Sequence, residues 1–464
     1  MQTHTEMNEK EENTSTSQSV DETVKESEST TEFNYNTIIS LGNKVRITDK
    51  DEVNNLELYC YVHCTENDSE NLHKCRGVVV HEKEIVLQAF PYTLEYNHTE
   101  TSEITSNIDP KQCKIYTSYE GSLIRMFCYN DTWYTCTHRK LNAFRSKWAS
   151  KESFGTGFKN SLENFYTTNT DFRNSLGDGT DSVYDKFVAT LEPKNQYMFI
   201  LTNNSENRIV CIPKEHSTIY HVGTFIDGVL NMDINCGIPM PEKHNFSSIE
   251  HMTKFVNNID LREVQGVICY TPNNKQIKVV NKDYQDLFKA RGNEPSIKFR
   301  YLQVRMNKKM SDMLYHLYPT KIKDFEEVEN ILYDICKNIY TAYVQRFIKK
   351  RFVSVPKEDY NVIKECHKWH ETDRITNRIT LEKVIKIVNE QTAINLNRMI
   401  RRFKSSKNEQ ETQQQNTQDQ IQTATAENTP IASPMTFPTN NSQVVSPLQL
   451  SAAPPTQIPI KIKI

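Results

Sequence analysis

Residues 111–150 read KQCKIYTSYEGSLIRMFCYNDTWYTCTHRKLNAFRSKWAS, and the fold is decided in this stretch. Three apolar, aromatic-rich runs in it are typical of β-strands, and Asn130-Asp131 marks a turn before the last one. The strands expected are 114–119, 123–129 and 132–137. Cationic side chains follow the third run, at Arg139, Lys140, Arg145 and Lys147. A sheet that ends in cations suits a ligand carrying phosphates, although an ordinary hairpin with a solvated basic end would give the same pattern.

The composition indicates several segments of different character. A chain of 464 residues has room for two or three domains, and a hydrophobic content of 37% is low for one fully packed globule. The net charge is −3 overall but −7 over residues 1–33. Residues 305–404 hold 21 Lys and Arg against 13 Asp and Glu, a net charge of +8. This basic segment favours a polyanionic partner, with a solvated helical surface as the alternative.

Several classes of protein are not expected. The eleven cysteines have no disulfide-like spacing, no opening segment resembles a signal peptide, and no stretch reaches transmembrane length. We therefore expect an intracellular protein with no membrane partner. No GxxxxGK motif is present, so a P-loop ATPase is not expected. Cys60, His63, Cys64, His73 and Cys75 lie close in sequence but lack zinc-site spacing, so buried packing is favoured over a metal site.

Taken in order, the chain predicts an α+β domain and then an α-helical domain, between two disordered tails. Many short strands mixed with helices indicate the α+β class. Apolar residues from Phe325 to Phe347 recur at spacings of three and four, which predicts one long amphipathic helix, and a second helix is expected from Leu381 to Phe403. The segments expected are an acidic tail at 1–34, the α+β domain at 35–305, the basic helical domain at 306–404 and a Gln/Thr/Pro-rich tail at 405–464.

Shorter patterns give the elements expected within the α+β domain. Strands are predicted at 56–62, 78–80, 85–89, 266–270 and 277–280, short helices between 150 and 190, and a hairpin over 196–211.

The central motif carries a family resemblance. Ser118-Tyr119-Glu120-Gly121-Ser122-Leu123-Ile124-Arg125, followed by a strand ending Trp-Tyr-Thr-Cys-Thr and a basic residue, resembles the core of the phage-type RNA ligases. These enzymes belong to the covalent nucleotidyltransferases, whose first motif is Lys-x-Asp-Gly. The lysine of that motif attacks ATP and carries AMP. Here Glu120 and Gly121 keep the acid and the glycine, but Ser118 stands in the place of the lysine.

Other motifs of that family follow in the right order, over roughly residues 56–305. Arg76-Gly77, with Phe90-Pro91 downstream, resembles the Arg-Gly strand of the family and its downstream Phe-Pro. Gln265-Gly266-Val267 resembles the family's Glu-Gly-Val, and Lys278-Val279-Val280 resembles its Lys-x-Lys. Leu201, before Asn207-Arg208-Ile209-Val210, stands where the family has a glutamate. The run from Lys278 to Arg305 also resembles a late-expressed, RNA-ligase-like group in asfarviruses, the African swine fever virus group.

The resemblance implies a ligase-type nucleotidyltransferase domain and ATP-dependent RNA end joining through AMP intermediates. It also implies ATP and Mg²⁺ as cofactors, nucleotide and RNA as partners, and a viral protein found in the host cytoplasm or packaged in the virion. The oligomeric state is not indicated. Since the motif lysine is missing, a non-catalytic relative that binds RNA or nucleotide, as a viral structural or accessory protein, stays open beside the active ligase.

The candidate site residues follow from the same motifs. Adenylate transfer needs a nucleophile of depressed pKa and cations around the triphosphate, and a serine hydroxyl does not replace a lysine without a base beside it. Lys114 and Lys140 are the candidates for a relocated nucleophile, and Glu120 is the main acid left. The expected nucleotide-binding residues are Arg76, Gly77, Ser118, Gly121, Arg125, Arg139, Gln265 and Lys278. Glu120, Arg139, Lys140 and Lys278 are expected to face one cleft, with Ser118 at its floor.

Overall fold

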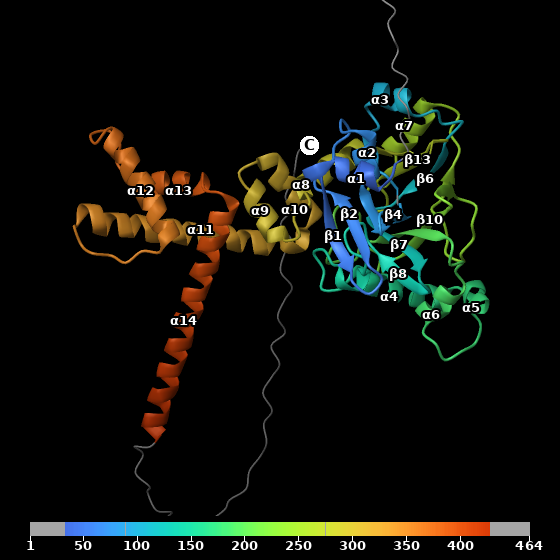
Figure 1. Ribbon diagram of the computed structural model, residues 1–464. Coiled ribbons are helices and arrows are strands. Elements are labelled where there is room, and N and C mark those ends of the chain that lie inside the picture. Colours follow the sequence, from blue (N-terminus) through green and yellow to red (C-terminus); the bar gives the residue numbers. More distant parts are fainter. Residues whose placement is uncertain (1–32, 89, 274, 427–464) are drawn as a thin grey trace, which may run out of the picture. The chain divides into compact units, whose positions relative to one another are not determined.

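The computed structural model describes residues 33–88, 90–273 and 275–426 (Figure 1). The chain divides into one unit that ends at Ile400 and a second that begins at Arg401. Three sheets and the helices around them fill the first unit, which confirms the predicted α+β class. Most of the two expected tails, residues 1–32 and 427–464, lies outside the described residues.

A four-stranded sheet with the order β1-β2-β3-β4 begins the folded chain. Its strands are β1 (Val45–Asp51), β2 (Leu56–Tyr61), β3 (Arg76–His81) and β4 (Glu84–Leu87), with helices α1 (Tyr35–Ser40) and α2 (Glu70–Lys74) beside them. Glu82 and Lys83 both have positive φ, 46° and 77°, which is the geometry of a two-residue hairpin turn. The predicted strands at 56–62 and 78–80 are confirmed, and the strand predicted at 85–89 is β4, which begins one residue earlier and ends two residues earlier.

The second sheet has the order β11-β10-β9-β7-β8. Its strands are β7 (Gly121–Tyr129), β8 (Thr132–Cys136), β9 (Gln196–Thr202), β10 (Ile219–Ile226) and β11 (Val229–Asn231). Asn130 and Asp131 have φ of 48° and 56°, so the predicted turn is confirmed as a two-residue hairpin. The predicted 196–211 hairpin is wrong, because β9 pairs with β10 and residues 203–218 form the loop between them.

The third sheet has the order β12-β6-β13-β14-β5, in which only β14 and β5 run parallel. Its strands are β5 (Leu94–Asn97), β6 (Lys114–Ser118), β12 (Lys243–His244), β13 (Gly266–Tyr270) and β14 (Gln276–Val280). The predictions for 266–270 and 277–280 are therefore confirmed to within one residue.

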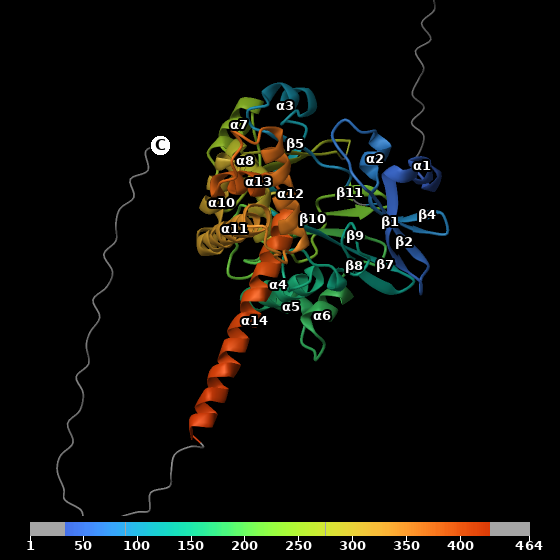
Figure 2. The same ribbon diagram turned by 90° about the vertical axis from the view of Figure 1, so that its left-hand side faces the viewer.

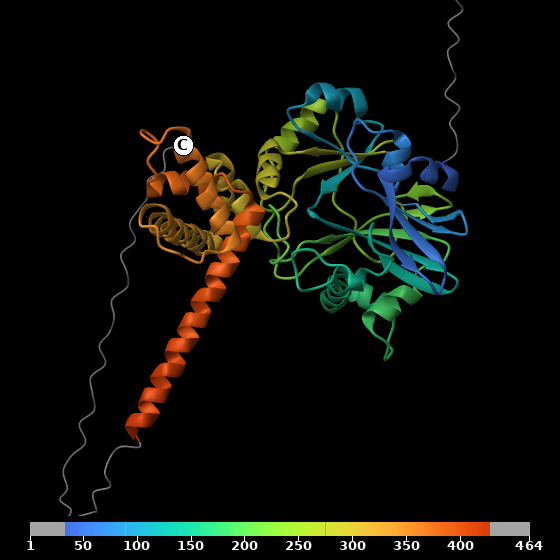
Figure 3. The ribbon, with the colours of Figure 1, turned by 60° about the vertical axis from the view of Figure 1, so that its left-hand side comes forward.

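The two five-stranded sheets face each other, and helices cover their outer faces (Figure 3). Helices α4 (Phe154–Thr168), α5 (Thr170–Leu176) and α6 (Val183–Ala189) pack on the second sheet, and they confirm the helices expected between 150 and 190. Helices α3 (Thr101–Asn107) and α7 (Ile249–Asn257) pack on the third sheet through a separate apolar cluster.

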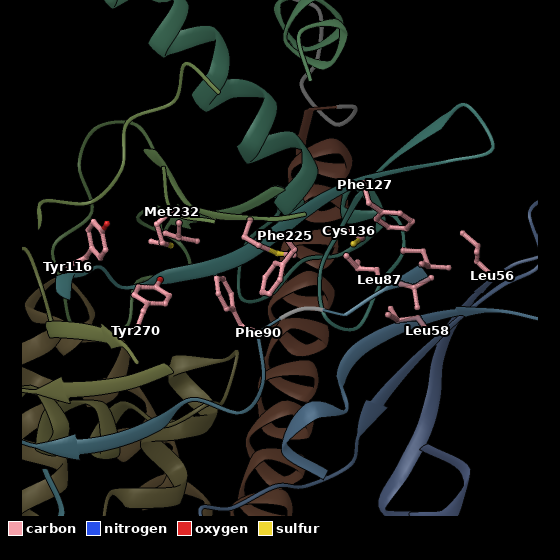
Figure 4. Packing of buried hydrophobic residues seen from close by; sticks show 14 residues of the cluster. Leu56, Leu58, Leu87, Phe90, Tyr116, Phe127, Cys136, Phe225, Met232 and Tyr270 are labelled. Atoms are coloured by element: carbon pink, nitrogen blue, oxygen red, sulfur yellow. The ribbon is translucent and has the colours of Figure 1, made fainter. Parts of the chain in front are cut away.

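One apolar cluster joins all three sheets on their inner faces. In Figure 4 it extends from Tyr116 and Tyr270 on the third sheet, through Phe90 and Phe225, to Leu58 on the first sheet. Phe90 is 1% exposed and Leu58 is fully buried, so the family-like Phe-Pro pair contributes a core side chain here. Burial of such side chains is the dominant stabilising term, and it fixes the spacing between the sheets.

The chain crosses from the third sheet to the second sheet between Ser118 and Gly121. Strand β6 ends at Ser118 and strand β7 begins at Gly121, so the central motif spans two sheets and not one strand. A Cβ atom on Gly121 would lie 2.3 Å from the carbonyl oxygen of Leu201 on β9, a distance that no real side chain tolerates. The motif glycine is therefore required for the close approach of β7 and β9.

The chain continues with helices α8 (Lys282–Arg291), α9 (Ile297–Val304), α10 (Lys308–Leu317), α11 (Ile322–Tyr343), α12 (Lys357–Thr372), α13 (Leu381–Asn389) and α14 (Ala393–Ala426). Figure 2 shows α11, α12 and α13 beside one another, and the contacts between them agree. The predicted apolar stripe of α11 is buried, and a π-helical turn extends the helix to Ile348.

No helix within 33–88, 90–273 and 275–426 is both long enough and apolar enough to cross a membrane.

Two expectations about the last helices are corrected. The helix predicted from Leu381 to Phe403 is broken, because α13 ends at Asn389 and the Thr392 hydroxyl accepts the backbone N–H of Asn395 at the start of a new helix. The tail expected from residue 405 is helical as far as Ala426. Residues 405–426 contain no Gly or Pro and many Gln and Glu, which tolerate a helix well.

Candidate nucleotide-binding cavity

A cavity of about 400 Å³ lies between the inner faces of the sheets. Ser118, Ile268 and Lys278 line it from the third sheet, and Leu123, Ile200 and Val222 line it from the second. Arg76 and Tyr61 reach it from the first sheet. Its size lies within the range of small-molecule sites, and aromatic rings mixed with a few polar groups are the usual lining of such sites.

The strand register explains why Ser118 and Lys278 share this cavity. Strand β13 lies between β6 and β14, so Gly266 pairs with both Ser118 and Val280, and Ile268 pairs with both Tyr116 and Lys278. Side chains alternate along a strand, so Ser118 and Lys278 point to the same face. Their neighbours Thr117 and Val279 point to the opposite face, where Val279 is part of the core beneath α3 and α7.

Arg76 is held at the cavity wall by hydrogen bonds. Its Nη1 donates to the carbonyl oxygen of Pro91 at 3.1 Å and to Oγ1 of Thr93 at 3.0 Å. The Thr93 hydroxyl donates in turn to Oε1 of Gln276, at 3.1 Å. These hydrogen bonds fix a guanidinium group beside the cavity, which is an arrangement suited to phosphate recognition.

Lys278 is the second cation of the cavity. Burial lowers its pKa, the positive charge of Arg76 lowers it further, and the carboxylate of Glu95 acts in the opposite direction. The residue lines the cavity and is half-buried. The Lys278 amine is therefore easier to deprotonate than that of an ordinary surface lysine.

Glu120 does not line this cavity, although it belongs to the central motif. Its carboxylate accepts hydrogen bonds from the side chains of Asn203 and Tyr284 and from the backbone N–H groups of Ile209, Val210 and Cys211. All five distances lie between 2.9 and 3.2 Å. The prediction that Glu120 faces the same cleft as Ser118 fails because the chain changes sheets between them, so the strand alternation does not continue.

The other family-like positions near the motif support its backbone. The Gln265 side chain donates from Nε2 to the carbonyl oxygen of Tyr119 at 2.8 Å, and its backbone N–H donates to the carbonyl oxygen of Ser118 at 3.1 Å. Gln265 is buried, with 4% of its surface exposed, and its two hydrogen bonds hold the backbone of residues 118–119 in place. Residues 207–210 fold over the Glu120 carboxylate as part of the β9–β10 loop.

Arg125 and Gly77, both predicted to bind nucleotide, form a structural contact. Arg125 is fully buried, and it donates to the carbonyl oxygens of Gly77 and, at 2.6 Å, of Thr137. It therefore joins the first sheet to the second. Gly77 has a φ of +75°, and a Cβ atom there would lie 2.7 Å from the Cα atom of His138, so only glycine fits.

The remaining predicted cations lie away from the cavity, which corrects the single expected cleft. The Nζ atom of Lys140 is 3.1 Å from Oδ1 of Asp49, and that of Lys114 is 3.4 Å from Oδ2 of Asp233. Arg139 is exposed. Lys114 starts the strand that Ser118 ends, and Arg139 and Lys140 follow β8 on the other sheet. Sequence spacing alone did not show that β6 and β8 belong to different sheets.

Two aromatic residues that the sequence did not single out stack beside the cavity. The rings of Tyr119 and Tyr220 stack with centroids 4.3 Å apart and an angle of 2° between their planes. Tyr119 lines the cavity and also a second hollow of about 950 Å³. That hollow carries cations, such as Lys254, together with acids, such as Glu242 and Glu263, so its charge is mixed.

The residues do not fit a protein-held Mg²⁺ ion. Leu201 is buried in an apolar cluster, Gln265 lacks charge, and the Glu120 carboxylate is occupied by five hydrogen bonds. Within the part of the chain that the structure describes, no group of three or more His, Cys, Asp or Glu is placed to hold a metal. Among the cysteines, burial raises the pKa of Cys75 to about 12 and that of Cys64 to about 11, which favours the neutral thiols.

The sequence is similar to viral proteins named immediate-early protein ICP-46. The homologue of invertebrate iridescent virus 6 is 28% identical over 75% of this chain and 80% of its own length. That of invertebrate iridescent virus 3 is 28% identical over 73% and 75%, and the frog virus 3 protein is 25% identical over 52% and 62%. These are iridovirus and not asfarvirus proteins, and their names state immediate-early and not late expression. No family model matches this chain.

Solved structures similar to this chain include ATP-dependent ligases. A putative ATP-dependent DNA ligase from Aquifex aeolicus has 11% identity and a TM-score of 0.37, over 61% of this chain and 77% of its own. An archaeal ATP-dependent RNA ligase has 9% identity and a TM-score of 0.33, over 59% and 69%. A Naegleria gruberi RNA ligase solved with ATP and Mn has 10% identity and a TM-score of 0.28, over 42% and 57%.

Proposed function

We propose that this chain binds a nucleoside triphosphate, ATP first, in the cavity between its sheets, as the nucleotide site of a viral RNA-ligase-like protein. The observation that carries the proposal is the convergence of Arg76 and Lys278 on a cavity that Ser118 also lines. A guanidinium fork and an ammonium group are the two usual partners of phosphates. Phe90, Tyr92 and Tyr270 supply aromatic walls that suit a base.

RNA is the proposed macromolecular partner. The net charge of +8 over residues 305–404 supports a polyanionic partner, and the order of the ligase-like motifs supports RNA end joining as the class of activity. The viral names of the relatives support a role in infected cells, in the host cytoplasm or in the virion.

A non-catalytic binding role is the second candidate, and two observations favour it. Serine replaces the motif lysine at 118, and the hydrogen bonds to Glu120 leave the central motif without an acid facing the cavity. In this role the cavity holds a nucleotide or an RNA end without activating it.

Nucleotide binding is tested by calorimetric titration of the full chain with ATP, GTP and AMP. Arg76→Ala and Lys278→Met should each weaken ATP binding by about 10- to 100-fold, the scale of a charge-assisted contact. Lys243→Met is the matched control, because Lys243 is an exposed lysine on edge strand β12 of the same sheet. An absence of saturable binding, or an equal loss in the Lys243 variant, would overturn the proposal.

A further inference from the structure

We propose that Lys278 is the nucleophile of this site, so that the covalent attachment point lies on β14 instead of β6. The inference rests on the proposed binding of ATP. Lys278 is the lysine that lines the cavity within the described residues, whereas Lys114 and Lys140 lie outside it and are ion-paired to Asp233 and Asp49. The position that the ligase motif gives to a lysine is occupied by Ser118, on the same cavity wall.

Ser118 and Lys278 lie on the same face of the third sheet, diagonally across strand β13. Two strand spacings separate β6 from β14, about 10 Å, and β13 contributes Gly266 opposite Ser118 and Ile268 opposite Lys278. Gly266 adds no side chain to the shared face, and a Cβ atom there would lie 2.1 Å from the carbonyl oxygen of Val279. A phosphate placed over Gly266 would therefore face the Ser118 hydroxyl, and the long Lys278 side chain would approach it diagonally from beside Ile268.

The surroundings of Lys278 suit an amine that attacks. An amine must be neutral to act as a nucleophile, and both burial and the charge of Arg76 favour the neutral form. Lys114 and Lys140 lie outside the cavity, and each is engaged in a partly exposed ion pair. Because Ser118 is short and uncharged, the floor of the cavity carries no second amine to compete for the phosphate.

The step is a nucleotidyl transfer to nitrogen. The lone pair of the Lys278 Nζ attacks the α-phosphorus of ATP, a P–N bond forms, and the bond from that phosphorus to the bridging oxygen of the β-phosphate breaks. Pyrophosphate leaves with the electron pair, and one N–H proton of Lys278 passes to solvent. The guanidinium of Arg76 stabilises the negative charge that builds up on the phosphate oxygens. The product is a lysyl phosphoramidate of AMP.

The test incubates the full chain with ATP labelled at the α-phosphate, in the presence of Mg²⁺ or Mn²⁺, and in parallel with GTP labelled in the same way. Label transferred to the protein is read on a denaturing gel. Wild type should take up an acid-labile, alkali-stable label, and the labelled tryptic peptide should contain Lys278. Lys278→Arg keeps a cation but not the nucleophile, so it should lose labelling at least 100-fold while its ATP affinity changes only a few-fold. Lys243→Met should label as wild type does, and matching melting curves would show that the variants fold.

The outcomes separate this inference from nucleotide binding. Wild type that binds ATP but takes up no label overturns the role of Lys278 and leaves the proposed binding function standing. A label that survives Lys278→Arg, or maps to Ser118, Lys114 or Lys140, also overturns it. Wild type that neither binds nor labels overturns both proposals.

Discussion

The Tyr284 hydroxyl donates a 3.0 Å hydrogen bond to Oε2 of Glu120, across 164 residues of sequence. Tyr284 is on α8 and is 1% exposed, and Glu120 lies at the crossing between two sheets. Burial and the negative charge of Glu120 raise the pKa of the Tyr284 hydroxyl, so it stays a donor. The motif acid thus ties α8 and the β9–β10 loop to the backbone that positions Ser118.

Glu120→Gln should therefore reduce stability more than catalysis. Five donors face this carboxylate, and an amide would turn a sixth donor toward them. We expect the free energy of unfolding, measured by urea denaturation, to fall by about 2–4 kcal/mol. Tyr284→Phe removes one of the donors and should cost about 1 kcal/mol. A Glu120→Gln variant as stable as wild type would show that the carboxylate does not hold the crossing together.

Stability should fall on acidification because of two buried histidines. Burial and the charges of Arg76, Arg125 and Arg139 lower the pKa of His138 to about 3, and burial lowers that of His221 to about 4. Both pKa values lie below the unfolded value, so the unfolded chain binds more protons and stability is lost as the pH falls from about 6.5 towards 4. Each group contributes a slope of up to about 1.4 kcal/mol per pH unit.

The measurement is the free energy of unfolding between about pH 4 and 7. His138→Gln and His221→Gln should each flatten the dependence on pH, whatever they do to stability at neutral pH. Control variants at exposed histidines such as His216 should keep the full slope. An unchanged slope in both buried variants would assign the acid sensitivity to carboxylates instead.

Local patterns predicted the strands, but not the sheets they join. Alternation and turn residues are properties of short segments, so β2, β7, β8, β13 and β14 were predicted to within a residue or two. The pairing of β6 with β13 joins residues about 150 positions apart, and nothing in either segment encodes it. The sequence therefore did not reveal that the chain changes sheets between Ser118 and Gly121, and Glu120 was expected in the cavity that it does not line.

The sequence predicted a cavity residue where a position in the family-like motifs also lies on the sheet face that lines the cavity. Arg76, Ser118, Gly121 and Lys278 were named from sequence, and all four line one cavity. Arg125 was named for the same reason, but it is a buried link between sheets, which only the packing around Gly77 reveals. The stacked pair Tyr119–Tyr220 gives no sequence signal, since aromatic residues are common on both strands.

Lys278 should add a second dependence of stability on pH, of the same sign as that of the histidines but at alkaline pH. Its folded pKa is lowered, so between that pKa and the pKa of an exposed lysine the unfolded chain binds the extra proton. Stability should therefore rise with pH across this window, and Lys278→Met should abolish that rise. Lys243→Met is the control and should leave it unchanged. An identical alkaline profile for wild type and Lys278→Met would mean that Lys278 stays charged in the folded protein.

RNA binding should depend steeply on salt. Lys349, Lys350 and Arg351 are exposed at the end of the helical segment that follows α11, and phosphate contacts made by such groups release counterions. Changing all three to alanine should lower the slope of log affinity against log salt by about 2–3 for a single-stranded RNA. The matched control replaces the exposed Lys111, Lys194 and Lys243. Equal slopes in the two triple variants would place the RNA elsewhere.

Ser118→Lys in the Lys278→Met background tests whether the cavity, and not one strand, directs the chemistry. Ser118 and Lys278 line the same cavity from the two strands that flank β13, so an amine that enters from β6 should reach the phosphate that Lys278 reaches from β14. We expect the Lys278→Met variant to be unlabelled by α-labelled ATP and the double variant to regain label on the peptide containing residue 118. Thermal melting and ATP titration of both variants verify folding and binding. A double variant that folds and binds ATP yet stays unlabelled would show that the phosphate is not held over Gly266.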